Sequence, residues 1–217
     1  MTHVVPDDHS PAAGPVTRMT EPEWDEMYGR SDRVWSGRPN HALVVETAHL
    51  MPGTALDVGC GEGADALWLA ERGWAVTAID VSSVALERAA AAARDAGVEV
   101  TWVHGGLTDA ALPSGGFDLV TAGYPALPSL PPDASVRALL GAVAPGGTLF
   151  VLHHDLDPDV VAAHGFDPAV YVSHDDVVAH LDECWRVETD DRRPRTISGG
   201  SGAHHVNDLV LRALRVG

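Results

Sequence analysis

The chain has 217 residues, with 14 Lys+Arg against 31 Asp+Glu and a formal net charge of −17. This balance argues against a nucleic-acid binder or a protein of anionic membrane surfaces, because both ligands are bound mainly through clustered cations. With 45% apolar residues, one domain with a buried core is expected. Only Cys60 and Cys184 are present, and no apolar run approaches the roughly 20 residues that span a bilayer. A reducing, cytoplasmic location is the default expectation.

The N-terminal part of the chain divides into two segments. Residues 1–20 contain several prolines and lack the basic and apolar regions of a signal peptide, so they predict a flexible arm. A polar, aromatic stretch follows over residues 21–40, and residues 41–50 have apolar positions at helical spacing. We expect residues 21–217 to form one domain, in which 21–50 is a segment that precedes the first strand.

After residue 53 the chain alternates short apolar strands with helices of about ten residues. Such alternation predicts βαβ units with right-handed crossovers and a mostly parallel sheet. The last two extended segments, 185–190 and 206–215, are joined by a turn-rich run without a helix, which predicts an antiparallel pair at a sheet edge. The other expected strands are 54–58, 75–80, 98–104, 117–122 and 148–152, and the expected helices are 64–72, 84–96, 133–143 and 175–181.

The strongest local signal is the run DVGCGEG at residues 57–63, directly after the first expected strand. Glycines at alternate positions let the backbone turn tightly and approach a ligand. The spacing formally fits a dinucleotide fingerprint, with Asp80 in reach of a ribose. However, Asp57 and Glu62 would repel a pyrophosphate and attract an ammonium or sulfonium cation. The expected ligand is therefore adenosine-bearing and cationic, as S-adenosylmethionine is.

This loop, Asp80 at the end of the next strand and Phe117-Asp118-Leu119-Val120 two strands on together resemble the class I S-adenosylmethionine-dependent methyltransferases. The resemblance covers roughly residues 24–215. It implies an α/β, Rossmann-like fold with a mostly parallel seven-stranded sheet, whose last two strands form an antiparallel C-terminal hairpin at the edge. Asp118 lies at a strand start, and we interpret it as structural.

The resemblance also implies how the cofactor is held. Asp80 should accept both ribose hydroxyls, Val81 should lie against the adenine, and the third strand should lead to the adenine edge. Many relatives carry an Asp that contacts the adenine amino group at the position where this chain has Gly106. Here Asp109, the backbone or water would have to make that contact. The implied cofactor residues are Asp57, Gly59, Cys60, Gly61, Gly63, Asp80, Val81, Gly106 and Leu107, with Cys60 a small packing residue of the loop.

The aromatic segment before the first strand resembles, more loosely, the N-terminal region of small-molecule methyltransferases of the tellurite-resistance, thiopurine and halide/thiol type. In those proteins the segment is a lid over the cofactor, and its aromatic residues line the acceptor pocket. By this resemblance Tyr28 and Arg38 contact the cofactor carboxylate, while Trp24 and Trp35 line the acceptor pocket. The alternative is a helix packed on the sheet edge, with Arg38 in solvent.

An acceptor is expected beyond the C-terminal ends of the strands, near loops 123–132 and 153–158. The first loop lacks the Asn/Asp-Pro-Pro-Tyr run of enzymes that methylate DNA bases or protein glutamine. Tyr124 is the candidate wall of the pocket and a candidate catalytic group, and His153 or His154 is a candidate general base. Packed loop side chains are the alternative for all three.

No metal is expected, because adjacent strand residues such as His153 and His154 point to opposite faces and no HExxH or paired-cysteine motif occurs. The resulting hypothesis is methyl transfer from S-adenosylmethionine to an O, N, S or chalcogen nucleophile of a small molecule. Two alternatives stay open: a non-catalytic protein that binds or senses the same cofactor, and an NAD(P)-dependent oxidoreductase. The oligomeric state is left open.

Overall fold

The computed structural model describes residues 18–113, 116–129, 133–156, 167–195 and 206–217. Most of the expected N-terminal arm, residues 1–17, lies outside this range. The strands are β1 (Thr54–Val58), β2 (Ala75–Asp80), β3 (Val100–His104), β4 (Phe117–Gly123), β5 (Val143–His154), β6 (Trp185–Pro194) and β7 (Asn207–Arg215). The helices are α1 (Glu21–Gly29), α2 (His41–Thr47), α3 (Ala64–Ala70), α4 (Ser83–Ala96), α5 (Ala134–Gly141), the 3-10 turn η1 (Pro168–Val170) and α7 (His174–Ala179).

The strands form one seven-stranded sheet in the order β3-β2-β1-β4-β5-β7-β6. The first five strands of this order run parallel, and β7 is antiparallel to both β5 and β6. The mostly parallel sheet with an antiparallel edge hairpin is therefore confirmed. Because the order changes direction between β1 and β4, the carboxyl ends of these two strands border a crevice of the kind in which ligands of such folds bind.

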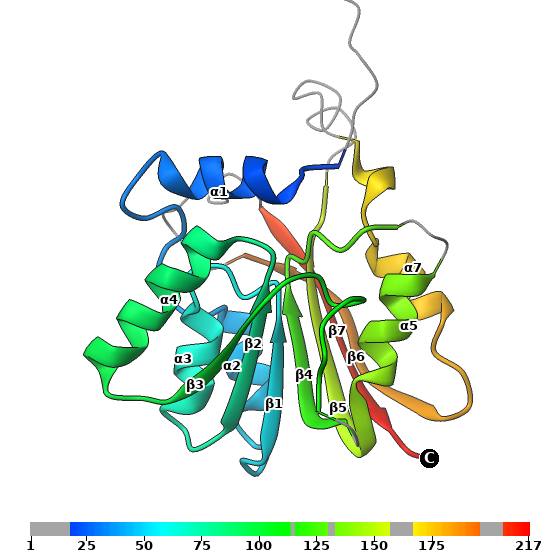
Figure 1. Ribbon diagram of the computed structural model, residues 1–217. Helices are drawn as coiled ribbons and strands as arrows, with labels where there is room; N and C mark the ends of the chain where they lie inside the picture. The colour runs from blue at the N-terminus through cyan, green and yellow to red at the C-terminus, as the bar shows by residue number, and fades with distance from the viewer. Residues whose placement is uncertain (1–17, 114–115, 130–132, 157–166, 196–205) are drawn as a thin grey trace, which may run out of the picture.

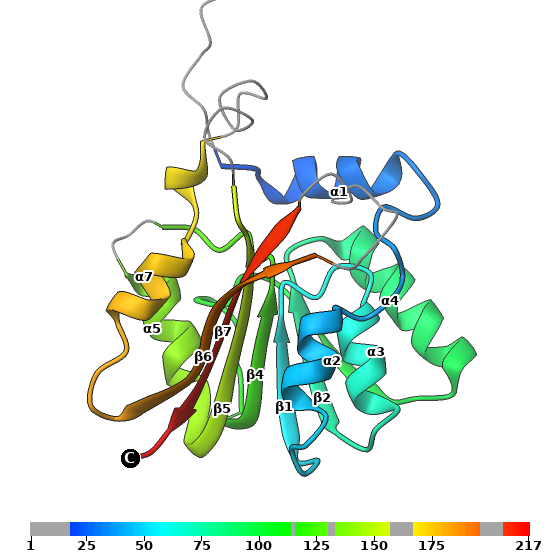
Figure 2. The same ribbon diagram turned by 180° about the vertical axis from the view of Figure 1, so that it is seen from behind.

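Hydrophobic residues fill both faces of the sheet. Leu56, Val120 and Leu149 belong to the core on the side of α5 and α7, whereas Leu69 and Phe150 belong to the core on the side of α2 and α3. Figures 1 and 2 show these helices on opposite faces, and α1 lies across the carboxyl ends of the parallel strands. Among the described residues, no helix is long and apolar enough to cross a bilayer.

β5 departs most from the expected bounds, because it begins at Val143 rather than at residue 148 and so includes the run Ala144-Pro145-Gly146-Gly147. Val143 pairs with Phe117 across a register shift in β4. A Cβ atom on Gly147 would lie 2.7 Å from the Phe117 carbonyl oxygen, so only glycine lets the two backbones approach here. The glycines that predict a loop thus serve strand pairing.

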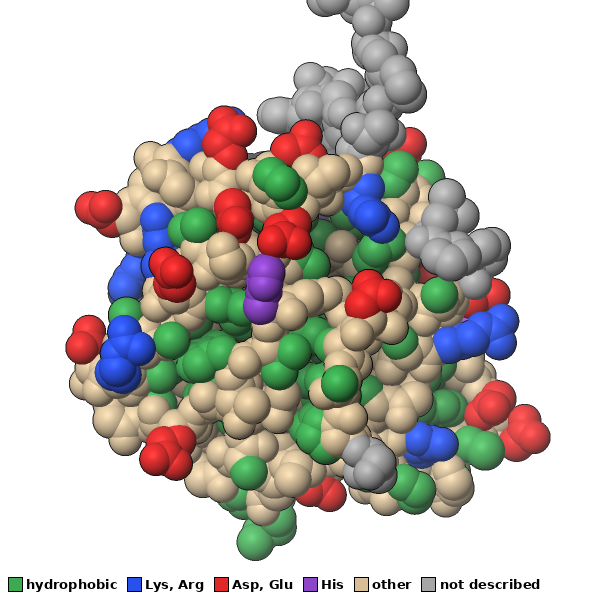
Figure 3. Space-filling view, viewed as in Figure 1, with side chains coloured by type: hydrophobic (Ala, Val, Ile, Leu, Met, Phe, Trp, Pro, Cys, Tyr) green, Lys and Arg blue, Asp and Glu red, His purple; other side chains and the backbone are tan. Residues whose placement is uncertain are grey.

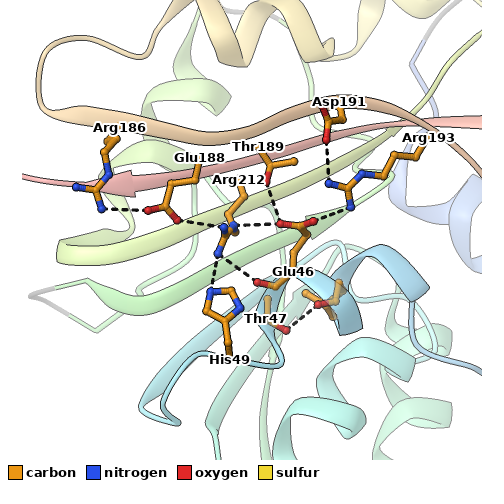
Figure 4. A network of polar contacts seen from close by, with 10 residues as sticks. Glu46, Thr47, His49, Arg186, Glu188, Thr189, Asp191, Arg193 and Arg212 are labelled. Atoms are coloured by element: carbon orange, nitrogen blue, oxygen red, sulfur yellow. Dashed lines mark hydrogen bonds and ion pairs between the residues drawn. The ribbon is translucent and has the colours of Figure 1, made fainter.

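A buried polar network joins α2 to the β6–β7 hairpin (Figure 4). Glu46 of α2 is 7% exposed, and its carboxylate lies 2.6 Å from Arg193 Nη1 and 3.1 Å from Arg212 Nε. Thr189 donates a hydrogen bond to the same carboxylate at 3.0 Å. Because a buried carboxylate needs such partners, the network fixes the distance between α2 and the hairpin.

On the face seen in Figure 3, acidic and arginine side chains of the described residues are interspersed rather than segregated. The basic residues are all arginine, since the sequence has no lysine. Arginine carries more hydrogen-bond donors than lysine and pairs with carboxylates in two places at once, as Arg193 and Arg212 do.

Candidate active site

The glycine loop between β1 and α3 adopts a conformation that requires its glycines. Gly59, Gly61 and Gly63 have φ angles of 68°, 53° and 81°, in the left-handed region. A Cβ atom on Gly61 would lie 2.8 Å from the Tyr28 hydroxyl, and one on Gly63 would lie 2.8 Å from the Ala89 Cβ. Side chains at these positions would therefore strain the backbone and collide with α1 and α4.

Asp80, at the end of β2, ties this loop to the turn after β2. Its Oδ2 accepts a hydrogen bond from the Gly61 N–H and its Oδ1 accepts one from the Ser82 N–H, both at 2.8 Å. Burial is the main cause that raises the pKa of Asp80. Since each carboxylate oxygen has two lone pairs, the side chain retains acceptor capacity for the hydroxyl groups of a ribose.

Two further buried carboxylates lie close to the loop. Asp57, on β1, is 2% exposed, and its Oδ2 has no hydrogen-bond partner among the described residues. Asp65, in the first turn of α3, accepts hydrogen bonds at 2.7 Å from both the backbone N–H and the side-chain amide of Asn40. Burial, and then repulsion by Asp65 and Asp80, raise the pKa of Asp57 well above its usual value. None of the described groups that shift this pKa is cationic.

The segment before β1 is attached to the glycine loop. Glu62, inside the loop, accepts hydrogen bonds from the N–H groups of Val34 and Trp35 and forms an ion pair of 3.0 Å with Arg88 of α4. The Trp35 indole donates a hydrogen bond of 3.0 Å to the Tyr28 hydroxyl, which lies against Gly61. Glu62 therefore attaches residues 34 and 35 to the glycine loop, a role that its charge alone does not predict.

A second attachment joins α1 to the start of α4. Asp25 accepts hydrogen bonds from the Ser82 hydroxyl at 2.6 Å and from the Ser83 hydroxyl at 3.0 Å, and a third from the Val84 N–H at 3.2 Å. A carboxylate at a helix N-terminus is stabilised by the free N–H groups there. Sequence reasoning missed Asp25, because it is one of four acidic residues in α1 and nothing local distinguishes it from the other three.

The remaining residues expected in the N-terminal segment take different positions. Trp24 is partly buried and packs in the small cluster that contains Tyr28 and Val34. Trp35 is 37% exposed and lies close to Gly61 through its indole nitrogen. Arg38 is exposed, and its backbone N–H donates to the Ser36 hydroxyl. The structure thus brings Tyr28 and Trp35 to the loop and leaves the Arg38 side chain at the surface.

The expected adenine edge lies at the ends of β2 and β3. His104 Nε2 is 3.0 Å from the Val81 carbonyl oxygen and 3.2 Å from a carboxylate oxygen of Glu21 in α1. Leu107 is buried in the core. A Cβ atom on Gly106 would lie 3.4 Å from Asp109 Oδ2, so the proposed substitute carboxylate does lie beside Gly106. Cys60 in the loop is half-buried, and burial raises the pKa of its thiol.

Tyr124 is the centre of a cluster at the carboxyl ends of β4, β5 and β6 and the start of β7. Its φ of 51° is in the left-handed region, and its ring stacks on His154 with centroids 4.0 Å apart. The Arg195 guanidinium lies 4.6 Å from the centre of the same ring. Burial, followed by the charge of Asp208, raises the pKa of Tyr124. Arg195 and Asp208 were not expected from the sequence.

His153 points to the other face of the sheet, as alternation along a strand requires. Its Nε2 lies 3.2 Å from the Val172 carbonyl oxygen, and its ring meets His174 edge-on, with centroids 6.1 Å apart. Burial lowers the pKa of His153 to about 4, so the ring is neutral at physiological pH. Within the described residues, no group of three His, Cys, Asp or Glu side chains has the arrangement of a metal site.

Asp118 lies at the opposite end of the sheet from the glycine loop. Its Oδ2 accepts hydrogen bonds from the Thr54 N–H at 2.7 Å and from the Thr54 hydroxyl at 2.8 Å, which lower the pKa of the carboxylate. These contacts join the start of β4 to the start of β1. They agree with the structural interpretation of Asp118.

A cavity of about 350 Å³ lies between α2 and the β6–β7 hairpin, next to Tyr124. The glycine before Tyr124 brings this cavity close to the loop: a Cβ atom on Gly123 would lie 2.8 Å from the Asn40 amide nitrogen and 3.3 Å from Asp65. The lining residues are His41, Ala42, Val45, Tyr124, Leu152, Arg193, Pro194, Arg195, Asp208 and Val210.

Comparisons of sequence agree with this arrangement. A family model described as "Methyltransferase domain" matches residues 55–147. An uncharacterised methyltransferase of Mycobacterium tuberculosis (strain ATCC 25618 / H37Rv) is 35% identical over 122 residues, which are 56% of this chain and 61% of that protein. A ubiquinone biosynthesis O-methyltransferase of Xanthomonas axonopodis pv. citri (strain 306) is 34% identical over 142 residues, 59% of each chain. The chain thus matches about three fifths of these relatives.

Solved structures extend the similarity to the whole sheet. A structure described as "Conversion of a Disulfide Bond into a Thioacetal Group during Echinomycin Biosynthesis" has a TM-score of 0.71 and 25% identity, with coverage of 90% of this chain and 92% of the other. TehB from Haemophilus influenzae has a TM-score of 0.64 and 13% identity, with coverage of 90% and 66%. The loop, the strand order and these matches show a Rossmann-like fold of the methyltransferase type, in which residues 55–147 are similar to a methyltransferase domain.

Proposed function

We propose that this protein transfers the methyl group of S-adenosylmethionine to a small-molecule acceptor. The observation that carries the proposal is the set of buried carboxylates around the glycine loop: within the described part of the chain, Asp57 Oδ2 has no hydrogen-bond partner and no cationic side chain acts on it. Repulsion among Asp57, Asp65 and Asp80 is offset when a cation enters, whereas a pyrophosphate would increase it. The residues present therefore fit an adenosine that carries an ammonium and a sulfonium.

In this proposal each part of the cofactor has partners in the chain. Asp80 accepts the ribose hydroxyls, the carboxylates Asp57 and Asp65 hold the methionine end beside the glycine loop, and Val81 and Leu107 border the adenine. The sulfonium supplies an activated methyl group. What the chain supplies is orientation and the exclusion of water, for which Tyr28 and Trp35 cover the loop.

The size and position of the cavity support a small acceptor. A volume of about 350 Å³ is at the low end for small-molecule sites, and Tyr124, which lines the cavity, follows Gly123, which lies close to Asp65. The curated relatives named for ubiquinone biosynthesis are O-methyltransferases, which supports a hydroxyl acceptor. The lid and Arg38 assignments, made by resemblance to the tellurite-resistance, thiopurine and halide/thiol type, stay part of this proposal.

A non-catalytic binder of the same fold is the alternative that the experiment must separate. One structural neighbour, at 23% identity and a TM-score of 0.61, is described as the [4+2]-cyclase SpnF, so the fold by itself does not decide which reaction follows. Calorimetry with S-adenosylhomocysteine and with NAD distinguishes the two cofactor classes. Transfer of a labelled methyl group to a broad panel of acceptors then distinguishes an enzyme from a binder: binding of S-adenosylhomocysteine without any transfer favours the binder.

A further inference from the structure

Two buried atoms in the wall of the cavity between α2 and the hairpin have no hydrogen-bond partner among the described residues. They are Asp208 Oδ1, on β7, and Arg195 Nε, just after β6. Both side chains are at least nine-tenths buried, with exposures of 10% and 8%. The nearest approach of Arg195 Nη1 to Asp208 Oδ1 is 3.8 Å, beyond hydrogen-bond distance. One acceptor and one donor thus remain unused side by side.

His154 and Tyr124, the other candidate groups of the cluster, already make contacts of their own, which leaves Asp208 as the candidate base. Arg195 Nη1 lies 3.0 Å from His154 Nδ1, and because arginine can only donate, His154 Nδ1 accepts that bond. This nitrogen is therefore committed and does not take a proton from an acceptor. Tyr124 and Asp208 line the same cavity, and their side chains interact. Asp208 is the carboxylate of the cavity wall, where proton transfer from an acceptor is feasible.

Only some functional groups satisfy both unused atoms. A carboxylate ligand would pair with Arg195 but be repelled by Asp208, and an ammonium would do the reverse. A hydroxyl group donates its proton to Asp208 Oδ1 and accepts from the Arg195 N–H at the same time. The rest of the wall includes Ala42, Val45, Leu152 and Val210, which suit an apolar body.

We propose that this cavity binds an apolar molecule through a hydroxyl group, and that Asp208 is the catalytic base that deprotonates it. The inference rests on the proposed function and deepens it by naming the acceptor class. The acceptor oxygen forms a bond to the methyl carbon of S-adenosylmethionine as the carbon–sulfur bond breaks, with that electron pair remaining on sulfur. The hydroxyl proton passes to Asp208, which later returns it to water, while Arg195 stabilises the negative charge on the oxygen. The products are a methyl ether and S-adenosylhomocysteine.

The charge state of Asp208 is compatible with this role. Burial raises its pKa, while the Tyr124 side chain and the charge of Arg195 oppose that effect. A carboxylate with a raised pKa is a stronger base than an exposed one, so it accepts a proton more readily. A thiolate acceptor, in contrast, is already ionised and needs no such group.

The first test needs no variant. Acceptor triplets that share one body and differ only in the nucleophile, such as 1-naphthol, 1-naphthalenethiol and 1-naphthylamine, are compared in methyl transfer, alongside aliphatic triplets of similar size. We expect the hydroxyl member of the best triplet to react fastest, and to bind the S-adenosylhomocysteine complex at least fivefold more tightly than the parent hydrocarbon in calorimetry. Faster reaction of the thiol or amine member overturns the inference.

The second test compares Asp208→Asn with Asp155→Asn. Asp155 is a matched control because it lies at the same end of the sheet and pairs with Arg192, yet it does not line the cavity. Asp208→Asn should lower turnover of the hydroxyl acceptor at least 100-fold, with the dissociation constant of S-adenosylhomocysteine unchanged within about twofold. Asp155→Asn should keep turnover within about threefold of wild type.

The outcomes separate this inference from the proposed function. If wild-type protein binds S-adenosylhomocysteine and methylates acceptors, but Asp208→Asn reacts within fivefold of wild type, the inference fails and the proposed function stands. If wild-type protein does not bind S-adenosylhomocysteine, or binds it without transfer to any acceptor, the proposed function fails and the inference fails with it.

Discussion

The two halves of the sheet's carboxyl edge treat buried charge in opposite ways. Around the glycine loop, Asp57 and Asp65 are buried without a cationic partner among the described residues, and burial, followed by repulsion from Asp65, raises the pKa of Asp57. At the hairpin, Asp208 faces Arg195 and Glu46 is bonded to two arginines. An unpaired carboxylate cluster calls for a cationic ligand, whereas a neutralised one suits a neutral ligand with a polar group. The contrast thus distinguishes a place for a cationic cofactor from a place for its acceptor.

The largest expected effect tests the cofactor half. Asp80→Ala removes the acceptor of the Gly61 and Ser82 N–H groups and of the ribose, so binding of S-adenosylhomocysteine should weaken by about 1.5–3 kcal/mol, roughly ten- to a hundredfold. Asp118→Ala is the control, because that carboxylate also accepts two hydrogen bonds but lies at the far end of the sheet. Calorimetry should show an unchanged affinity for the control. Equal affinities of Asp80→Ala and wild type would remove the ribose assignment.

The next effect tests the acceptor half. Tyr124→Phe removes the hydroxyl that interacts with Asp208 but keeps the ring that stacks on His154, so turnover should fall by about tenfold with cofactor affinity unchanged. His154→Ala should also cost less than about 100-fold, because its Nδ1 accepts a bond from Arg195 and is not free to act as the base. Steady-state kinetics measure both. A loss of 10⁴-fold from either change would move the catalytic base from Asp208 to that residue.

A third prediction concerns stability and pH. Because burial raises the pKa of Asp57 in the folded protein, the folded state holds more protons than the unfolded state between the unfolded value, about 3.9, and the raised one. Stability from this group therefore falls as pH rises through that window. Asp57→Asn should raise Tm of the protein without cofactor by about 2–4 °C at pH 8, and the gain should vanish toward pH 4.

The same substitution should weaken S-adenosylmethionine binding, since the cation loses a carboxylate partner. Melting curves at several pH values, with and without cofactor, measure the two effects together. A lower Tm at pH 8 would mean that the Asp57 carboxylate has a partner that offsets its burial.

The smallest effect concerns the attachment of the N-terminal segment. Glu62→Ala removes the acceptor of the Val34 and Trp35 N–H groups, so limited proteolysis before residue 40 should become faster and the affinity for S-adenosylhomocysteine should fall about threefold. Glu26→Ala is the matched control, because Glu26 forms an exposed pair with Arg30 in α1. Identical cleavage of Glu62→Ala and wild type, in the presence of ligand, would count against a lid.

The fold was predictable because its periodicities are local. Each strand before β5 is a short apolar run between turn residues, and the missing helix between the last two strands indicates the hairpin. The bounds of β5 were not predictable, since the run Ala144-Pro145-Gly146-Gly147 has loop composition and enters the strand only through pairing with β4. That pairing depends on contacts which no local pattern encodes.

The two halves of the site also differ in how far the sequence predicts them. The loop at residues 57–63 and Asp80 were predictable, since consecutive residues and a strand end define them. Arg195 and Asp208 were not, because Arg192, Arg193 and Arg195 look alike in sequence and only the packing of the hairpin buries one of them beside Tyr124. His153 and His154 illustrate the same limit: alternation separates them, but which one faces the cavity depends on register.

The attachment of the N-terminal segment to the glycine loop has a thermodynamic consequence. Glu62 and Ser82 each belong to a turn that surrounds the cofactor site, and each also bonds to the segment that covers it. Binding equilibria are reciprocal. If attachment of the N-terminal segment increases the affinity for the cofactor by some factor, the bound cofactor stabilises that attachment by the same factor. S-adenosylhomocysteine shares the adenosine and the amino-acid end with the substrate form, so it benefits from the same coupling. Under the proposed function, this segment has to open before S-adenosylhomocysteine leaves, so its opening is a step that can limit turnover.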